Sequence, residues 1–582
     1  MPTPLTPLHA EVASAVAACA GVPATDVHIE ICPRPELGDL AVNCFAIAKV
    51  RGESPVATAQ HIAAHIRNYA WIESAAAAGP FVNFRAHRPT VLQWLTEAAR
   101  SSTLLPRALG DNQTIIVDYS SPNVSKQLAY HHIRSTMIGH SLVQIFRALG
   151  YTVVGINHLG DWGTTHGKLI AAWKLWGPID PLDIAKLNEL YVRFGEAAKA
   201  DPSLEDLGRA WFKKLEDGDP EAKELWKRFY DISMAEYASV YALLGVTFDV
   251  VKGESEYLAD VPSILAELAE KNLSTESQGA LVVELPDEKT PLILRKSDGA
   301  TTYATRDIPS AEYRWNTWHF ARSLYVVDRG QSLHFRQLFK TLARMGRPWA
   351  SRCEHVPFGL VQIVAKPKAG SPGEAQKVKA GTRSGNVVLL KGVIAEAEAR
   401  VRTLLAEIHP ELTGDALSKI ATEVGMGAVV FANLTAQRDK DVAFDWERVI
   451  ALQGDSGPYL QYSHARCAAI MRKAGGDWAG SNIDFAMLKH DGEWAVARKL
   501  LAFPAAVVAA TPKCEPHIIC HYLLELAGEF SRWYTAGNSD ASLRVLCDDV
   551  PTRHARLALV AAVQAVLREG LALLGIAAPD QM

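Results

Sequence analysis

The stretch DYSSPNVSKQLAYHHIRSTMIGHSL, residues 118–142, decides the fold that we expect for this chain. Before it, the apolar, β-branched run TIIVDY at 114–119 predicts a buried strand. After the polar turn SSPNVSKQ, the pattern at 131–150 predicts a helix that ends at Gly150. A strand that ends in a carboxylate and leads into a helix N-terminus is a layout that binds anions such as phosphate.

Length and composition indicate a multi-domain globular protein. A chain of 582 residues exceeds what one hydrophobic core supports. Its net charge of −4 excludes a uniformly basic coat for nucleic acid, although it allows local basic surfaces. Eight scattered cysteines without a CxxC pair favour reduced thiols over disulfides or a structural metal. We find no signal sequence and no apolar run of membrane-spanning length, and therefore expect a cytoplasmic protein.

The order of the predicted elements divides the chain into three parts. Residues 1–105 predict an α+β module, in which LAVNCFAIAKV at 40–50 is expected to be a helix and GPFVNFRA at 79–86 a strand. From 106 to 395 strands alternate with helices, which predicts a doubly wound parallel sheet with a helical insertion at about 180–250. From 396 to 582 helical periodicity dominates, which predicts an all-α bundle.

The motifs resemble those of the arginyl-tRNA synthetases, a family of class I aminoacyl-tRNA synthetases. SSPNxxK, the histidine-bearing helix start and RSTxIG carry the resemblance first. PELGDLAVNCFAIAK and GPFVNFR resemble the family's N-terminal domain, while GPYLQYSHAR and the ending LLGIAAPDQM resemble its anticodon-binding domain. The resemblance implies a Rossmann-like catalytic domain, an N-terminal domain that touches the outer corner of tRNA, and a C-terminal anticodon-binding bundle.

The resemblance also implies a site for the amino acid arginine. A planar guanidinium pairs best with carboxylates, and the family's acidic position before SSPN is Asp118 in this chain. Tyr303 and Asp307 are four residues apart and share one helix face. The residues expected to bind arginine are Asp118, Ser120, Asn123, Tyr303, Asp307 and Gln331.

Class I enzymes use two signatures to activate the amino acid with ATP and its Mg²⁺. The first, His-x-Gly-His, falls at 129–132, and the second lies in KVKAGTRSG at 377–385 with two residues inserted. Which cation of the second signature acts on pyrophosphate stays open. By resemblance, the ATP-binding residues are Lys126, His131, His132, Gly160, Asp161, His334 and Lys379. The catalytic residues expected in the same way are Lys126, His132, Lys377, Lys379 and Arg383.

The first signature departs from the family pattern. It reads Ala129, Tyr130, His131, His132, so the final histidine is kept and the glycine is replaced. Glycine there lets adenine approach the backbone closely, so the His131 side chain must point away, stack or donate to phosphate. Two interpretations follow: a tolerated variant in which Lys126 serves a phosphate, or a loss of activation.

Aromatic and basic residues on the predicted C-terminal helices indicate contacts with unpaired RNA bases. Tyr459, Tyr462 and Arg466 are three and four residues apart and share a face, and Trp533 lies in a similar setting. Core packing is the competing interpretation for each aromatic residue. The tail that ends at Met582 is expected to be packed.

The resemblance therefore implies an ATP-dependent ligase that attaches L-arginine to tRNA(Arg) through arginyl-adenylate, acting as a monomer. Two alternatives stay open. One is a paralogue that binds tRNA or arginine without forming adenylate, and the other is a ligase of a specialised pathway.

Overall fold

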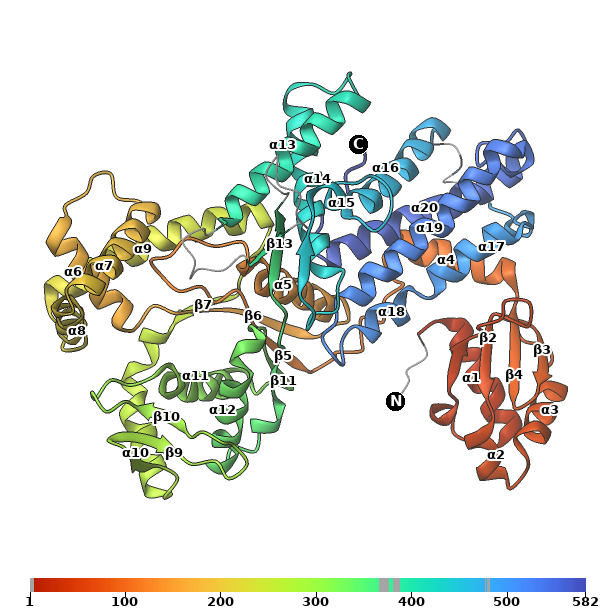
Figure 1. Cartoon of the computed structure of the whole chain (residues 1–582). Coiled ribbons are helices and arrows are strands. Elements are labelled where there is room, and N and C mark those ends of the chain that lie inside the picture. Colours follow the sequence, from red (N-terminus) through yellow and green to blue (C-terminus); the bar gives the residue numbers. More distant parts are fainter. Residues whose placement is uncertain (1–4, 366–375, 380–387, 477, 479–481) are drawn as a thin grey trace.

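A five-stranded parallel sheet carries the loops of the candidate site. Its strand order is β12-β11-β5-β6-β7. The strands are β5 (Thr114–Asp118), β6 (Thr152–Leu159), β7 (Val250–Gly253), β11 (Arg322–Tyr325) and β12 (Cys353–His355). The computed structural model describes residues 5–365, 376–379, 388–476, 478 and 482–582. Figure 1 shows the sheet near the centre of the molecule.

The strand, turn and helix expected around residues 118–142 are confirmed. Helix α5 (His132–Ala148) follows β5 and packs against it. Gly150 has a φ of +87°, the left-handed conformation expected just past a helix end. β6 then pairs in parallel with β5, so α5 is the crossover of a βαβ unit.

Helices cover both faces of the sheet, which confirms the doubly wound fold. Alternate residues of β5 point to opposite faces. Ile115 and Val117 pack in the same core as Met137 of α5, while Ile116 packs in a second core with Ile308 of α11 (Tyr303–Trp318). Further elements around the second core are α10 (Val261–Glu270), α12 (Ser332–Arg344), β8 (Thr275–Ser277), β9 (Ala280–Val283) and β10 (Leu292–Arg295).

Helices inserted between β6 and β7 form a unit with its own core. They are α6 (Thr164–Trp176), α7 (Ile184–Ala200), α8 (Ser203–Glu216) and α9 (Pro220–Leu244). Figure 1 shows them as the orange and yellow group at the far end from the N-terminal module.

The N-terminal module is an antiparallel sheet with helices, and one of its predicted elements was wrong. The sheet order is β1-β2-β4-β3. The module contains α1 (Pro7–Ala20), β1 (Ile29–Ile31), β2 (Leu40–Asn43), α2 (Phe45–Arg51), α3 (Pro55–His65), β3 (Ile72–Ala78) and β4 (Phe81–Ala86), and α4 (Arg88–Arg100) follows. The helix predicted at 40–50 begins only at Phe45, because Leu40 and Val42 pair with Phe84 and Val82 of β4.

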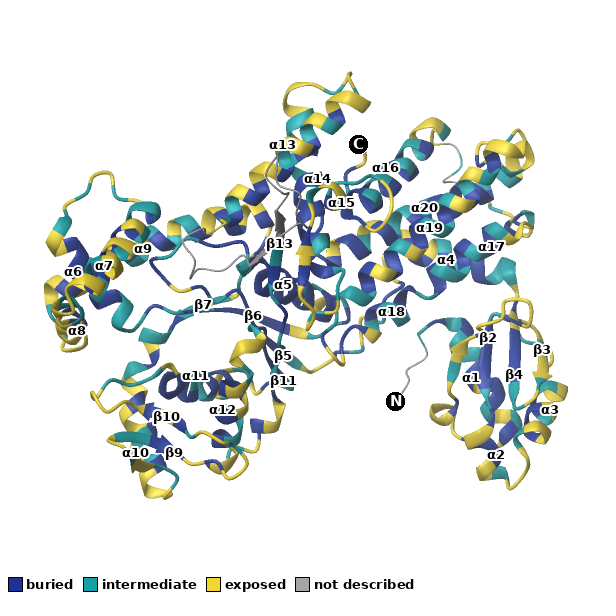
Figure 2. Ribbon diagram, viewed as in Figure 1, coloured by how far each residue is buried: buried dark blue, intermediate teal, exposed yellow. Residues whose placement is uncertain are grey.

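The C-terminal part is helical, as expected. Its helices are α13 (Leu390–Ile408), α14 (Gly414–Leu434), α15 (Trp446–Val449), α16 (Gly457–Ala474), α17 (Asp491–Leu501), α18 (Phe503–Ala509), α19 (His517–Ser539) and α20 (Val550–Leu573). A small sheet, β13 (Val361–Ala365), β14 (Gln376–Lys379) and β15 (Val442–Phe444), joins this part to the parallel-sheet region. In the described part of the chain α14 alone is long and apolar enough to cross a membrane, and 61% of its most apolar window is buried. Figure 2 shows that burial, which is typical of a core helix.

Side chains of the parallel-sheet region and the tail complete the bundle. Arg134 of α5 is buried and donates to the carbonyls of Asn433, at the end of α14, and Arg438 at 2.5 and 2.7 Å. The tail is packed as expected, because Gln461 donates to the Ala577 carbonyl at 2.9 Å and Met582 is 8% exposed. The bundle and the parallel-sheet region therefore share one continuous core.

The contact between α5 and β5 yields a stability prediction. A Cβ atom on Gly139 would overlap the Tyr119 side chain at its base, so Gly139→Ala forces backbone or ring movement. We expect the free energy of unfolding to fall by about 1–3 kcal/mol. In Gly195→Ala, a control within α7, the added methyl meets nothing within 4 Å, and stability is expected to rise slightly. Urea unfolding of both variants checks this, and equal stability in both would contradict close packing at Gly139.

Candidate active site

The candidate site lies where the carboxyl ends of β5, β6 and β11 meet. β5 stands between β6 on one side and β11 on the other. Connections leave this point in opposite directions, which is where open α/β sheets bind ligands. Asp118 ends β5, His158 lies one residue before the end of β6, and Asp328 follows β11.

The SSPN loop after β5 is held in an unusual backbone conformation. Ser120, Ser121 and Ser125 have φ values of +70°, +46° and +69°, a region that costs free energy for residues other than glycine. Hydrogen bonds offset this cost: the Ser120 N–H donates to Ser135 Oγ at 2.9 Å, and its hydroxyl lies 2.8 Å from that of Tyr241. The Ser120 side chain is buried in these contacts and is not brought into the cluster around Asp307.

The structure brings Asn123, predicted to bind arginine, next to Gly160, predicted to bind ATP. The two residues form a parallel bridge between the SSPN loop and the end of β6. A side chain at Gly160 would overlap the Asn123 side-chain oxygen, so glycine permits this close approach. The Tyr237 hydroxyl donates to the carbonyls of Asn123 and Lys126 at 2.8 and 2.7 Å, which ties the loop to α9.

Asp118 is paired with an arginine of the protein itself. Arg314 of α11 donates to Asp118 Oδ2 at 2.7 Å, and the Ser121 hydroxyl donates to Oδ1 at 2.8 Å. The Arg314 side chain is 1% exposed. Burial opposes its charge, but the Asp118 carboxylate raises the pKa of Arg314 above its usual value. Sequence reasoning missed Arg314, which lies in YRWNTW outside the motifs.

A second carboxylate, Asp307, lies between two imidazoles. Its Oδ2 is 2.7 Å from His334 Nε2, and its Oδ1 is 3.7 Å from His158 Nε2. Burial raises the pKa of Asp307, but the hydrogen bond from His334 and the neighbouring positive charges outweigh burial and lower it overall. The Tyr303 ring packs on His334 with centroids 4.6 Å apart. Gln331, at the start of α12, is exposed.

The altered signature forms the start of α5. His131 precedes the first helical residue, His132, and their ring centroids are 4.1 Å apart. His132 Nδ1 lies 3.0 Å from both the backbone nitrogen and the carbonyl oxygen of Ala129, which orients the ring. Burial, with the neighbouring His131 and Lys126, lowers the pKa of His132 to about 3, so the ring is neutral at pH 7.

A cavity of about 160 Å³ lies beside this helix start. Its lining is mainly apolar and comes from the SSPN loop, α5 and the segments after β11 and β12. The lining residues are Ser120, Ser121, His131, His132, Ser135, Val326, Val327, Asp328, Phe358, Gly359, Leu360 and Val361. Both histidines of the signature therefore border one small pocket.

Two further residues predicted to bind ATP, Lys126 and Asp161, contact different elements of the structure. Lys126 Nζ is 5.1 Å from the centroid of the Tyr191 ring of α7. Asp161 is buried, and Ser255 donates to it through its N–H at 2.9 Å and its hydroxyl at 2.6 Å. Burial raises the pKa of Asp161 despite these hydrogen bonds. The Asp161 carboxylate thus ties β6 to the segment after β7.

The second signature is only partly described. Lys377 and Lys379 lie in β14, which pairs antiparallel with β13. Arg383 lies outside the described residues. The segment 388–390 pairs with the first signature, because the Tyr130 N–H donates to the Val388 carbonyl and the Leu390 N–H to that of Leu128, at 2.8 and 2.9 Å.

The predicted aromatic contacts of the bundle need one correction. Trp533 is 2% exposed and packs in the core, so it is not brought to the surface, whereas its neighbour Tyr534 is half-buried. The Arg466 guanidinium lies 4.8 Å from the Tyr462 ring and 5.4 Å from the Tyr534 ring. A cavity of about 220 Å³ adjoins Arg466, Tyr534 and Arg544. Tyr459 is partly buried and packs against the core.

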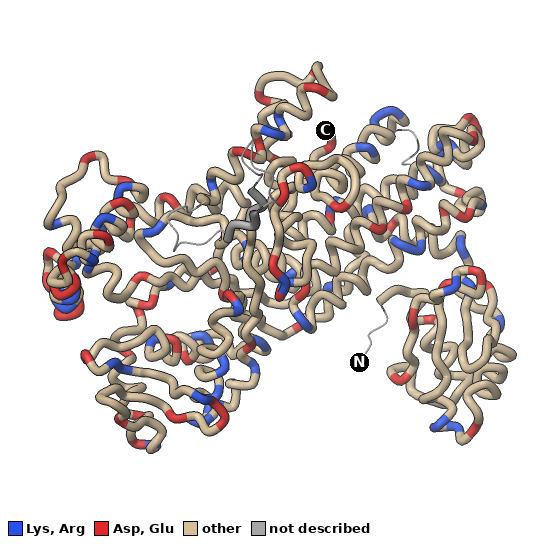
Figure 3. Tube along the Cα trace, viewed as in Figure 1, with Lys and Arg blue, Asp and Glu red and all other residues tan. Residues whose placement is uncertain are grey.

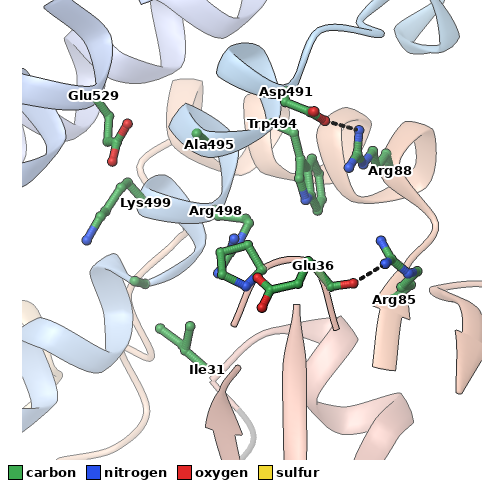
Figure 4. Close-up of a pocket in the computed structure, with 12 residues that line it drawn as sticks. Ile31, Glu36, Arg85, Arg88, Asp491, Trp494, Ala495, Arg498, Lys499 and Glu529 are labelled. Carbon is green, nitrogen blue, oxygen red and sulfur yellow. Dashed lines mark hydrogen bonds and ion pairs between the residues drawn. The ribbon is translucent and has the colours of Figure 1, made fainter. Parts of the chain in front are cut away.

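A larger groove of about 660 Å³ separates the N-terminal module from the bundle. Figure 4 shows Arg85 and Arg88 on one side and Arg498 and Lys499 on the other. Trp494 also lines the groove, and its indole N–H donates to Asp39 at 2.8 Å. The lining also contains the acidic residues Glu36, Asp491 and Glu529. Acidic and basic residues are likewise interspersed along the rest of the chain, as Figure 3 shows.

Comparison with known proteins agrees with this geometry. Residues 95–446 match the family described as "tRNA synthetases class I (R), catalytic domain". Residues 460–582 match "DALR anticodon binding domain", and residues 6–86 match "Arginyl tRNA synthetase N terminal domain". The doubly wound sheet, with a signature helix at its switch point, is thus the fold of a class I aminoacyl-tRNA synthetase.

Full-length relatives identify the family within that class. The chain is 39% identical to an arginine–tRNA ligase of Clostridium perfringens over 95% of its length and 96% of the relative's. It is 42% identical to one of an Exiguobacterium species, covering 94% of each. The solved arginyl-tRNA synthetase of Thermus thermophilus matches with a TM-score of 0.81 and 25% identity over 99% of this chain and all of that one. This chain belongs to the arginyl-tRNA synthetase family.

Proposed function

We propose that this protein attaches L-arginine to tRNA(Arg) in two steps driven by ATP. The observation that carries the proposal is the Asp307 carboxylate, which lies 2.7 Å from His334 and 3.7 Å from His158 near the end of β6, the strand beside β5 with its SSPN loop and signature helix. The guanidinium of arginine would pair with Asp307, beside Tyr303, while Asn123 meets the end of the substrate that reacts. Gln331 would border the same site.

In the first step, a carboxylate oxygen of arginine attacks the α-phosphorus of ATP, and the bond to the β-phosphate oxygen breaks. Arginyl-adenylate and pyrophosphate, which leaves with the Mg²⁺ of the nucleotide, are the products. Lys126, His132 and the positive end of the α5 dipole would stabilise the charge that develops on phosphate. We assign Lys377, Lys379 and Arg383 to pyrophosphate. In the second step, the terminal 2′-OH of tRNA attacks the activated carbonyl and AMP leaves.

We propose other roles for the remaining predicted residues, on the basis of the contacts that each one makes. Asp118 is already paired with Arg314 of α11. It would therefore act on arginine through its negative charge and by fixing the position of α11. Ser120 and Asp161 would hold the loops in place. His131 and Gly160 would border the nucleotide, and His334 would orient Asp307. We further propose a cytoplasmic monomer, with residues 1–105 and 396–582 as its tRNA-contacting parts around a catalytic domain at 106–395.

Charging of total tRNA with labelled arginine and ATP tests the proposal. We expect charging with arginine and none with lysine or citrulline. Asp307→Ala leaves a guanidinium unpaired and should raise the KM for arginine by about 30-fold or more. Asp287→Ala, which removes an exposed carboxylate, is the matched control and should change nothing. An unchanged KM for arginine in Asp307→Ala would show that Asp307 does not bind the substrate guanidinium.

The altered signature yields a second prediction. His132 is the histidine kept from the family motif, so His132→Ala should lower kcat by about 100-fold or more. Restoring the motif with the double variant Ala129→His/His131→Gly should leave ATP–pyrophosphate exchange, measured with tRNA present, within about threefold. If the natural chain is inactive and the double variant active, the natural protein is a binding paralogue.

The groove of Figure 4 is proposed to meet the outer corner of tRNA. The double variant Arg85→Gln/Arg88→Gln should raise the KM for tRNA several-fold and reduce the salt dependence of binding by about one or two charges. The KM values for ATP and arginine should stay the same. Lys213→Gln, which removes an exposed cation of α8, is the control. An unchanged salt dependence would contradict a phosphate contact at this groove.

A further inference from the structure

His158 is a buried imidazole whose hydrogen-bonding capacity is unused. It lies in β6, and its side chain is 13% exposed. Neither ring nitrogen has a hydrogen-bond partner within the described part of the chain, although both atoms are buried. Buried polar atoms in folded proteins are nearly always bonded, so such a group points to a ligand that completes it.

The charged groups around His158 are held by other partners, with one exception. Glu254 is paired with Arg306 at 2.6 Å, and both oxygens of Asp161 accept from Ser255. Asp307 Oδ2 is taken by His334, but Oδ1 faces His158 Nε2 at 3.7 Å. That separation is too long for a hydrogen bond between the two. A carboxylate oxygen and an imidazole nitrogen therefore lie side by side. In the neutral tautomer that carries its proton on Nδ1, Nε2 is a second acceptor beside Oδ1.

We infer that His158 is a further specificity-determining residue of the arginine site, whose Nε2 accepts one N–H of the substrate guanidinium while Asp307 Oδ1 accepts a neighbouring one. A guanidinium presents several N–H donors in a fixed planar fork, which suits two acceptors set side by side. The ammonium of lysine is a compact point charge and lacks that fork. The inference rests on the proposed arginine site and adds a contact that the sequence motifs do not contain.

Paired amide substitutions test the inference. Glutamine can place its amide oxygen near the position of Nε2, whereas asparagine places it near Nδ1. We expect His158→Asn and His158→Ala to raise the KM for arginine about tenfold, with kcat and the KM for ATP unchanged. His158→Gln should stay within about threefold of the natural enzyme. Exchange of pyrophosphate into ATP, measured with tRNA present while arginine is varied, gives these values.

A matched control separates recognition from folding. His140 of α5 is also buried with an unpartnered ring nitrogen, Nδ1, and packs near Gly575, so His140→Gln should change thermal stability without changing the KM for arginine. Equal KM values for natural enzyme and His158→Ala, or equal losses in the glutamine and asparagine variants, would overturn the inference. Failure of the natural enzyme to charge arginine would instead overturn the proposed function.

Discussion

The buried ion pair between Asp118 and Arg314 is the constraint on which the site depends. It joins the end of β5 to the C-terminal half of α11, at the point where the connections between strands leave the sheet in opposite directions. An unpaired charge at this depth would cost several kcal/mol, roughly 3–5, so the two elements are held together strongly. Because α11 carries Tyr303 and Asp307 on its first turns, the pair also sets how far these side chains stand from the SSPN loop.

The hydrogen bonds of the SSPN loop complement that pair. Three serines adopt left-handed backbone conformations, and small hydroxyl side chains allow the loop to be fastened to α5 and α9. The result is a rigid rim that leaves the helix start and its histidines facing a small cavity. Rigid positioning of this kind is what phosphoryl and nucleotidyl transfer require, since little covalent chemistry falls to the protein.

The sequence predicted the local elements better than the contacts between them. The β5–α5 unit could be predicted because its hydrophobic period changes from strand to helix within one stretch. Asp307 and His334 could be placed in one pocket only through motif resemblance. Arg314 and His158 were missed. Arg314 is 196 positions from Asp118 in the sequence and His158 is 149 positions from Asp307, and contacts at such separations leave no local sequence pattern. Trp533 was misplaced because one position on a helix separates the buried face from the exposed one.

The contact of Arg134 and Tyr130 with Asn433 bears on how the chain could be dissected. Both side chains belong to the catalytic region, yet they complete hydrogen bonds at the last turn of a bundle helix. In a fragment that ended near residue 395, the Arg134 guanidinium would lose its carbonyl acceptor and the Tyr130 hydroxyl would lose its amide donor. The boundary at residues 395 and 396, which the order of the predicted elements suggested, is therefore not a site at which limited proteolysis or exchange of the bundle between relatives would separate two independent units. The catalytic region and α14 are better treated as one cooperative unit.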